Sequence, residues 1–195
     1  MNEEKNPSCK VVLMGNSGVG KTSLINRWTT GVWSRSVKPT IGANHQKKTV
    51  RLENKSVDVF VWDTAGQEQF QSLTPLYARS SSCAIIICSI NDRSSFDTIA
   101  SWIDLVRSAC EKMPPVLLAV NKNDLANEAV YSNQEIEQKY GKDFVATFFV
   151  SAQTGENIDG LFLLAAKIGD EFTQGYKMDS VTIKSKNSKS DSSCC

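Results

Sequence analysis

The chain has 195 residues, 41% of them hydrophobic, which suits one domain with a sizeable core and short tails better than two domains. Its 22 basic and 21 acidic side chains leave a formal net charge of +1, so the overall charge does not favour nucleic acid as a partner. The first residues lack the basic-then-apolar order of a signal peptide, and no apolar run approaches the length of a membrane span.

Apolar runs and alternating patterns predict the strands. Most runs are continuously apolar, as expected of strands that helices cover on both faces. The second and third strands are expected to be joined by a turn at Asn54-Lys55. The expected strands are 11–14, about 43–52, 57–62, 83–88, 116–120 and 144–150.

Apolar residues at helical spacing predict the helices. Gly31, Pro114 and Gly141 are expected to end three of them, and a capping box begins at Ser132. The expected helices run from about 21 to 31, 94 to 112, 132 to 141 and 158 to 172. Residues 32–41 and 64–79 lack this periodicity and are expected to form loops, the second with one helical turn.

The alternation of strands and helices predicts one three-layer α/β/α domain, with a mostly parallel central sheet and one antiparallel edge strand. This domain is expected to span 9–175, after a flexible amino terminus at 1–8. Beyond Gly175 serine, lysine and asparagine dominate, which predicts a disordered tail at 176–195.

Four cysteines, Cys9, Cys83, Cys88 and Cys110, lie in or beside apolar segments without the spacing of metal ligands. This pattern favours buried free thiols in a reducing compartment, and therefore synthesis in the cytosol.

The segment from Gly15 to Thr22, GNSGVGKT, matches the pattern G-x-x-x-x-G-K-[ST] between a strand and a helix. Its glycines let successive backbone N–H groups turn toward phosphate oxygens, and the following helix adds its positive end. Lys21 would add a charge at the β- and γ-phosphates, and Thr22 a hydroxyl for Mg²⁺. The alternative is an ordinary glycine-rich turn, which this context disfavours.

Asp63 ends an apolar strand and opens the sequence DTAGQE. A carboxylate at this edge of a parallel sheet can hold Mg²⁺ through a water molecule. Gly66 could bring its N–H to a γ-phosphate, and Gln67 could orient a water for in-line attack. A surface loop with incidental acids is the alternative.

The segment from Asn121 to Asp124, NKND, follows a buried strand and should lie at the same edge of the sheet. The Asp124 carboxylate can accept two parallel hydrogen bonds from guanine N1–H and N2–H₂, which adenine cannot offer. By itself this tetrapeptide is also an acceptable turn; after the two preceding motifs it indicates guanine.

These ordered motifs resemble those of Ras-superfamily small GTPases, which have the P-loop NTPase fold. Within that superfamily, Pro39 to Gly42, Trp62, the segment 67–77 and the terminal Cys-Cys resemble the Rab family. The motifs that carry the resemblance are 15–22, Thr40, 62–68, 121–124 and Ser151-Ala152, and the match runs from about 10 to 172.

The resemblance implies a role for each matching residue. Thr40 would reach Mg²⁺ and sense the γ-phosphate, and Trp33 would place an aromatic edge against guanine. Lys21, Thr40 and Gln67 would serve catalysis, and Thr22, Thr40 and Asp63 would hold Mg²⁺. The implied nucleotide-binding residues are Ser17, Gly18, Val19, Gly20, Lys21, Thr22, Ser23, Trp33, Thr40, Gly66, Asn121, Lys122, Asp124, Ser151, Ala152 and Gln153. Asn121 would brace the phosphate loop, Lys122 would lie along the base, and the Ala152 N–H would read the guanine oxygen.

As a family member the chain would be a monomeric GDP/GTP switch in vesicular membrane trafficking that hydrolyses GTP and uses Mg²⁺. The implied partners are effectors, an exchange factor, a GTPase-activating protein, an escort protein and a GDP-dissociation inhibitor. Cys194 and Cys195 are predicted to carry geranylgeranyl groups, which would place the protein on the cytoplasmic face of an endomembrane, cycling with the cytosol. Two unmodified thiols are the alternative.

The chain departs from the family pattern at several positions. His45 stands where many Rabs have Phe, in an expected aromatic cluster with Trp62 and Tyr77; a changed choice of partner is favoured over pH sensing. Gln153 stands where Lys is usual, which could loosen nucleotide binding. Ser80-Ser81 replace Gly-Ala, with no consequence that we can derive.

Two other functions remain open from the residues alone. A non-hydrolysing scaffold that holds one guanine nucleotide is suggested by His45 and Gln153. An ATP-using P-loop kinase is disfavoured by Asp124.

Overall fold

The computed structural model describes residues 6–64 and 73–187, with side chains up to 175. It contains a six-stranded sheet of order β2-β3-β1-β4-β5-β6. The β2–β3 pair is antiparallel and every other pair is parallel, which confirms the expected fold class. The strands are β1 Ser8–Met14, β2 Ala43–Arg51, β3 Ser56–Thr64, β4 Cys83–Ser89, β5 Val116–Asn121 and β6 Thr147–Phe149.

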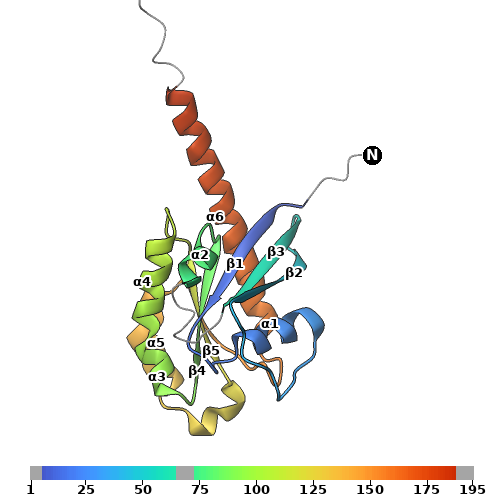
Figure 1. The fold of residues 1–195 in the computed structure, drawn as a ribbon, viewed down its shortest axis with the longest axis vertical. Helices are drawn as coiled ribbons and strands as arrows, with labels where there is room; N and C mark the ends of the chain where they lie inside the picture. The colour runs from blue at the N-terminus through green and yellow to red at the C-terminus, as the bar shows by residue number, and fades with distance from the viewer. Residues whose placement is uncertain (1–5, 65–72, 188–195) are drawn as a thin grey trace, which may run out of the picture.

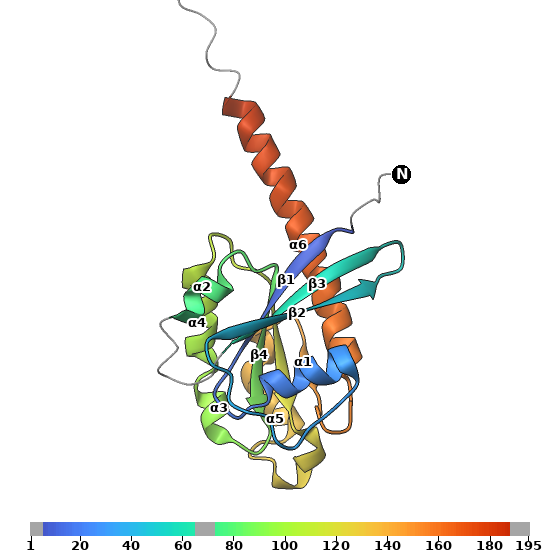
Figure 2. The same cartoon turned by 45° about the vertical axis from the view of Figure 1, so that its right-hand side comes forward.

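Helices cover both faces of the sheet (Figures 1 and 2), with α1 and α6 on one face and α2 to α5 on the other. Two apolar clusters fill the layers, one beneath α1 and α6 and one beneath α3, α4 and α5. Trp28 and Phe162 stack at 4.2 Å between ring centroids in the first layer. The helices are α1 Lys21–Thr30, α2 Thr74–Ala78, α3 Arg93–Asp97, α4 Ile99–Ala109, η2 Asn123–Glu128, α5 Asn133–Tyr140, η3 Gly141–Asp143 and α6 Ile158–Asn187.

Several elements differ from the sequence-based prediction; β1 begins at Ser8 rather than at 11, and η2 was not predicted. The helix expected at 94–112 is split at Thr98 into α3 and α4 and ends at Ala109; the Thr98 hydroxyl bonds Asn16 at the junction. The strand expected at 144–150 is shorter, as β6. Helix α6 runs to Asn187, where disorder was expected from 176; that stretch has neither glycine nor proline, so the helical hydrogen bonds can continue.

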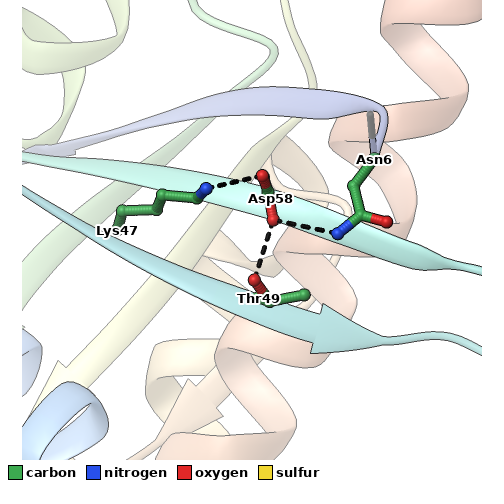
Figure 3. A network of polar contacts seen from close by, with 4 residues as sticks. All are labelled: Asn6, Lys47, Thr49 and Asp58. Carbon is green, nitrogen blue, oxygen red and sulfur yellow. Dashed lines mark hydrogen bonds and ion pairs between the residues drawn. The ribbon is translucent and has the colours of Figure 1, made fainter. Parts of the chain in front are cut away.

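The β2–β3 hairpin is held to the amino-terminal strand by a polar network around Asp58 (Figure 3). Lys47 pairs with its Oδ2 at 2.7 Å, and Thr49 and Asn6 donate to its Oδ1 at 2.8 and 3.3 Å. The bonds from Lys47 and Thr49 lower the pKa of this carboxyl. This network lies where the chain enters β1, so it fixes the edge strand against the parallel core of the sheet.

The expected burial of the thiols is confirmed: Cys9, Cys83 and Cys88 are free and buried, and Cys110 is half-buried. Desolvation raises the pKa of the Cys9 thiol to about 12 and those of Cys83 and Cys88 further, so all three stay protonated in the fold. Across the described residues, no helix is both long and apolar enough to cross a membrane.

Candidate functional site

The loop between β1 and α1 forms a backbone cradle at the carboxyl edge of the sheet. Gly15 and Gly20 have positive φ values of 144° and 98°. A Cβ atom at Gly15 would collide with the Ile87 carbonyl, and one at Gly20 would collide with the Asn121 amide. The motif therefore needs glycine at both positions, because neighbouring groups lie too close for a side chain and because the backbone has positive φ values.

Lys21 lies inside this cradle, only 5% exposed. Its ammonium donates to the Gly15 carbonyl at 2.7 Å and to the Asn16 carbonyl at 2.9 Å. Desolvation lowers the pKa of this amine to about 8, and the nearby Asp63 carboxylate opposes that shift. The structure thus places the Lys21 ammonium inside the phosphate loop, where neutral carbonyl groups bind it without cancelling its positive charge.

Thr22, Thr40 and Asp63 meet beside Lys21, although Thr40 and Asp63 lie 18 and 41 residues from Thr22 in the sequence. The two threonine hydroxyls are 2.8 Å apart and lie 2.7 and 3.0 Å from Asp63 Oδ2. The second oxygen, Oδ1, is buried and has no hydrogen-bond partner in the described part of the chain. Burial also raises the pKa of this carboxyl, although both threonines oppose the shift.

This cluster fits a Mg²⁺ ion. Hydroxyl and carboxylate oxygens are the ligands that Mg²⁺ prefers, and it usually keeps several waters and binds one or two carboxylates. An unpartnered buried carboxylate oxygen is costly, and a cation or its water would satisfy it. The residues brought together are therefore chemically suited to the ion.

Asp124 and Ser151 lie together at the ends of β5 and β6. The Ser151 hydroxyl donates to Asp124 Oδ1, which orients a carboxylate that is otherwise exposed to the cavity. Lys122 has a positive φ of 63°. The chain therefore turns sharply between Asn121, which is buried, and the Asp124 carboxylate. The tetrapeptide 121–124 thus presents one oriented carboxylate at the carboxyl edge of the sheet.

Asn121 links the phosphate loop to the next segment of the site, as expected. Its amide donates to the Val19 carbonyl at 2.8 Å, and its oxygen accepts from the Ala152 N–H at 3.2 Å. The Ala152 donor, expected to read a guanine oxygen, is therefore already engaged in a long bond. Reading a base would require that bond to be shared or released.

Lys21, Thr22, Thr40, Asn121 and Asp124 line one cavity of about 720 Å³, a volume suited to a small-molecule ligand, whereas Asp63 is buried behind the two threonines that it bonds. Of the expected nucleotide-binding residues, Val19 and Ser151 are buried behind its wall rather than in it. The expected residues that line it are Ser17, Gly18, Gly20, Lys21, Thr22, Ser23, Trp33, Thr40, Asn121, Lys122, Asp124, Ala152 and Gln153. Ser34 and Arg35 also line the cavity and were not predicted, because a loop without periodicity does not indicate which of its side chains face a ligand.

Sequence reasoning also missed the contacts of Asn16. Its Oδ1 accepts from the Thr98 hydroxyl at 2.9 Å and from the Trp102 indole N–H at 3.1 Å. Its amide lies 3.4 Å from the Ser94 carbonyl. The α3–α4 junction therefore fixes one end of the phosphate loop, and no spacing in the sequence could have indicated a contact across 86 residues.

The expected aromatic cluster is present on the β2–β3–α2 surface. His45 stacks on Trp62 at 5.0 Å between ring centroids, and Trp62 stacks on Tyr77 at 6.0 Å. Lys10 lies over the Trp62 ring at 4.8 Å. Gly66, Gln67, Cys194 and Cys195 lie outside the described residues.

Comparison with known proteins shows the family of the chain. The Ras family model matches residues 10–169. The chain is also 34% identical to the Ras-related protein Rab-1D of Dictyostelium discoideum over 187 aligned positions, covering 91% of this chain and 89% of that protein. The chain belongs to the Ras family, as a Rab-type small GTPase.

As a Rab-type GTPase, the protein binds GTP and GDP with Mg²⁺, hydrolyses GTP and acts in membrane trafficking. The family works with effectors, exchange factors, GTPase-activating proteins and a GDP-dissociation inhibitor. Neither comparison favours the alternative of a non-hydrolysing scaffold.

Proposed function

We propose that the nucleotide lies across the 720 Å³ cavity, with its phosphates on the loop 15–22 and its guanine against Asp124. The observation that carries this proposal is that Lys21, Thr22, Thr40 and the oriented Asp124 carboxylate line one cavity, with the Asp63 carboxylate bonded to both threonines. A cation and N–H groups at one end, and a hydrogen-bond acceptor at the other, match phosphate and guanine respectively.

In this proposal each group has one task. Lys21 stabilises charge on the β- and γ-phosphates, and Thr22, Thr40 and Asp63 hold Mg²⁺, which neutralises phosphate charge when bound. Thr40 also reports the presence of the γ-phosphate, because its loop would be held there and released after hydrolysis. Trp33, Lys122 and Ala152 contact the base.

Gln67 is proposed to orient the attacking water. Gln67→Leu is therefore expected to lower single-turnover GTP hydrolysis by roughly 10²-fold, within the range for removal of such a group. Its GDP and GTP affinities should stay within about twofold of the unchanged protein, since leucine keeps the side chain's bulk. Rapid-quench assays on preloaded protein measure the first quantity, and nucleotide displacement the second. Unchanged hydrolysis would remove Gln67 from this role.

We also propose that Cys194 and Cys195 each carry a geranylgeranyl group. One lipid chain binds a membrane only marginally, and two give a stable anchor. Mass spectrometry of protein from its native cell should find the doubly lipidated carboxyl-terminal peptide in the membrane fraction. An unmodified peptide from that fraction would contradict the proposal. With this anchor the protein would act on the cytoplasmic face of an endomembrane and return to the cytosol with its escort and inhibitor proteins.

The surface around His45, Trp62 and Tyr77 is proposed to bind effectors, because it is an aromatic stack next to the loop that carries Thr40. Exposed apolar side chains flank it, with Ile41 82% and Leu76 64% exposed. A histidine in the stack adds a hydrogen-bonding group where phenylalanine would offer only a ring. We therefore propose that His45 alters the choice of effector.

A further inference from the structure

Residues 151–157, the base loop, connect β6 to α6 and carry the Ala152 N–H and the Ser151 hydroxyl. The base loop has internal backbone bonds, with the Gly155 N–H donating to the Ser151 carbonyl at 2.8 Å and the Ser151 N–H to the Glu156 carbonyl at 3.2 Å. These bonds make the base loop a compact turn, and its bonds to neighbouring segments help to fix its position.

One outside contact comes from the tetrapeptide that contains Asp124. The Asn123 side-chain amide lies 3.1 and 3.0 Å from the two carboxylate oxygens of Glu156. The Asn123 backbone N–H also donates to the Val150 carbonyl at 3.0 Å, immediately before the base loop. Asn123 thus joins the two segments expected to contact the two edges of guanine.

The second outside contact comes from α1, which follows the phosphate loop. The Arg27 guanidinium donates to the Gly31 carbonyl at 2.8 Å, at the end of its own helix, and to the Thr154 carbonyl at 3.1 Å. The Arg27 guanidinium therefore links the end of α1 to the tip of the base loop. Asn123 and Arg27 therefore add two further points of attachment to the bonds that Ser151 makes to Asp124 and Ala152 makes to Asn121.

We propose that Asn123, Glu156 and Arg27 are positioning residues that set the lifetime of bound guanine nucleotide by holding the base loop in register with Asp124. This inference rests on the proposed placement of guanine. Ser151 bonds Asp124, and in the proposed placement Ala152 reads the base oxygen, so a shift of the base loop would disturb hydrogen bonds to both edges of the base at once. These three residues, here called the clamp, lie outside the cavity and need not contact the nucleotide itself.

The test is the release rate of fluorescent GDP from the full chain with Mg²⁺ present. Asn123→Ala and Glu156→Ala are each expected to speed release about three- to tenfold, the effect of losing one partly exposed hydrogen bond to a charged group. The double variant should be no faster than the faster single variant, because both changes break the same contact. Glu156→Gln keeps a carbonyl acceptor and should stay within about twofold of the unchanged protein.

Asn91→Ala is the matched control. Asn91 donates to Glu128 at 3.3 Å and accepts from the Ser89 hydroxyl at 2.8 Å; neither contact touches the base loop, so its removal should leave GDP release unchanged. If Asn123→Ala releases GDP at the control's rate, the clamp is overturned. If the unchanged protein fails to bind GDP at all, the proposed function fails instead, so the two failures are distinguishable.

A second readout separates positioning from general loosening of the fold. In 6-thio-GDP a sulfur, a weaker acceptor, replaces the oxygen that Ala152 would read. The acceleration of release caused by Asn123→Ala should therefore be smaller for 6-thio-GDP than for GDP, with the melting temperature of the nucleotide-free protein unchanged. Equal acceleration for both nucleotides, or a lowered melting temperature that accounts for the change, would overturn the proposal.

Discussion

Asp124→Asn is expected to lower the affinity for GDP by roughly 10⁴-fold and to give the protein a preference for xanthosine diphosphate, because a site built on hydrogen bonds rejects an unmatched base by this order. The asparagine oxygen can still accept from guanine N1–H, but its amide would face the guanine amino group, donor against donor. Xanthine has a carbonyl at that position, which the amide can bond.

The structure makes this substitution a clean test of the base reader. Ser151 donates to Asp124 Oδ1, and an asparagine oxygen at the same position can accept that bond, so the local geometry should persist. Competition of GDP, XDP and ADP against a fluorescent nucleotide measures the change. Asp124→Asn protein that keeps its GDP affinity within tenfold would show that another group reads guanine.

Removal of Mg²⁺ by chelation is expected to speed GDP release from the unchanged protein by on the order of 10²-fold, the effect of losing several kcal/mol of phosphate charge stabilisation. In Thr22→Ala this difference should largely disappear. The variant loses the hydroxyl that lies 2.7 Å from Asp63 and 2.8 Å from the Thr40 hydroxyl, so the ion has one direct ligand fewer.

Thr30→Ala is the matched control for that experiment. Thr30 lies in the same helix, and its hydroxyl donates to the Asn26 carbonyl at 2.7 Å and accepts from the Val32 N–H at 3.2 Å, so neither bond involves the cluster. Its release rates with Mg²⁺ and with chelator should match those of the unchanged protein. A Thr22→Ala variant with the full dependence on Mg²⁺ would mean that the ion is held elsewhere.

The sequence predicted the phosphate loop well because its chemistry is local. Gly15, Gly20 and Lys21 act within one turn of backbone between a strand and a helix, and adjacent residues cannot separate in space. The buried strands were equally clear, since continuous apolar runs suit strands covered on both faces.

Element ends were predicted less well, because tertiary contacts determine them. One periodic helical pattern is divided at Thr98, where the hydroxyl bonds Asn16 in the phosphate loop. The ladder between β6 and β5 pairs Thr147 to Phe149 and so begins later than the apolar residues suggested, although the Val145 N–H and the Ala146 carbonyl also bond β5. Periodicity reports which face of an element is buried, and says little about where its partner ends.

By itself the sequence determined the fold class, the phosphate loop and the likeness to Rab GTPases, because these depend on residues close together in the chain or on motifs in a fixed order. Only the tertiary structure decided that Thr40 and Asp63 meet Thr22, that Trp102 holds Asn16, and that Asn123 and Arg27 hold the base loop. Such contacts join residues on different loops, and their distances depend on how strands and helices pack rather than on the spacing of residues.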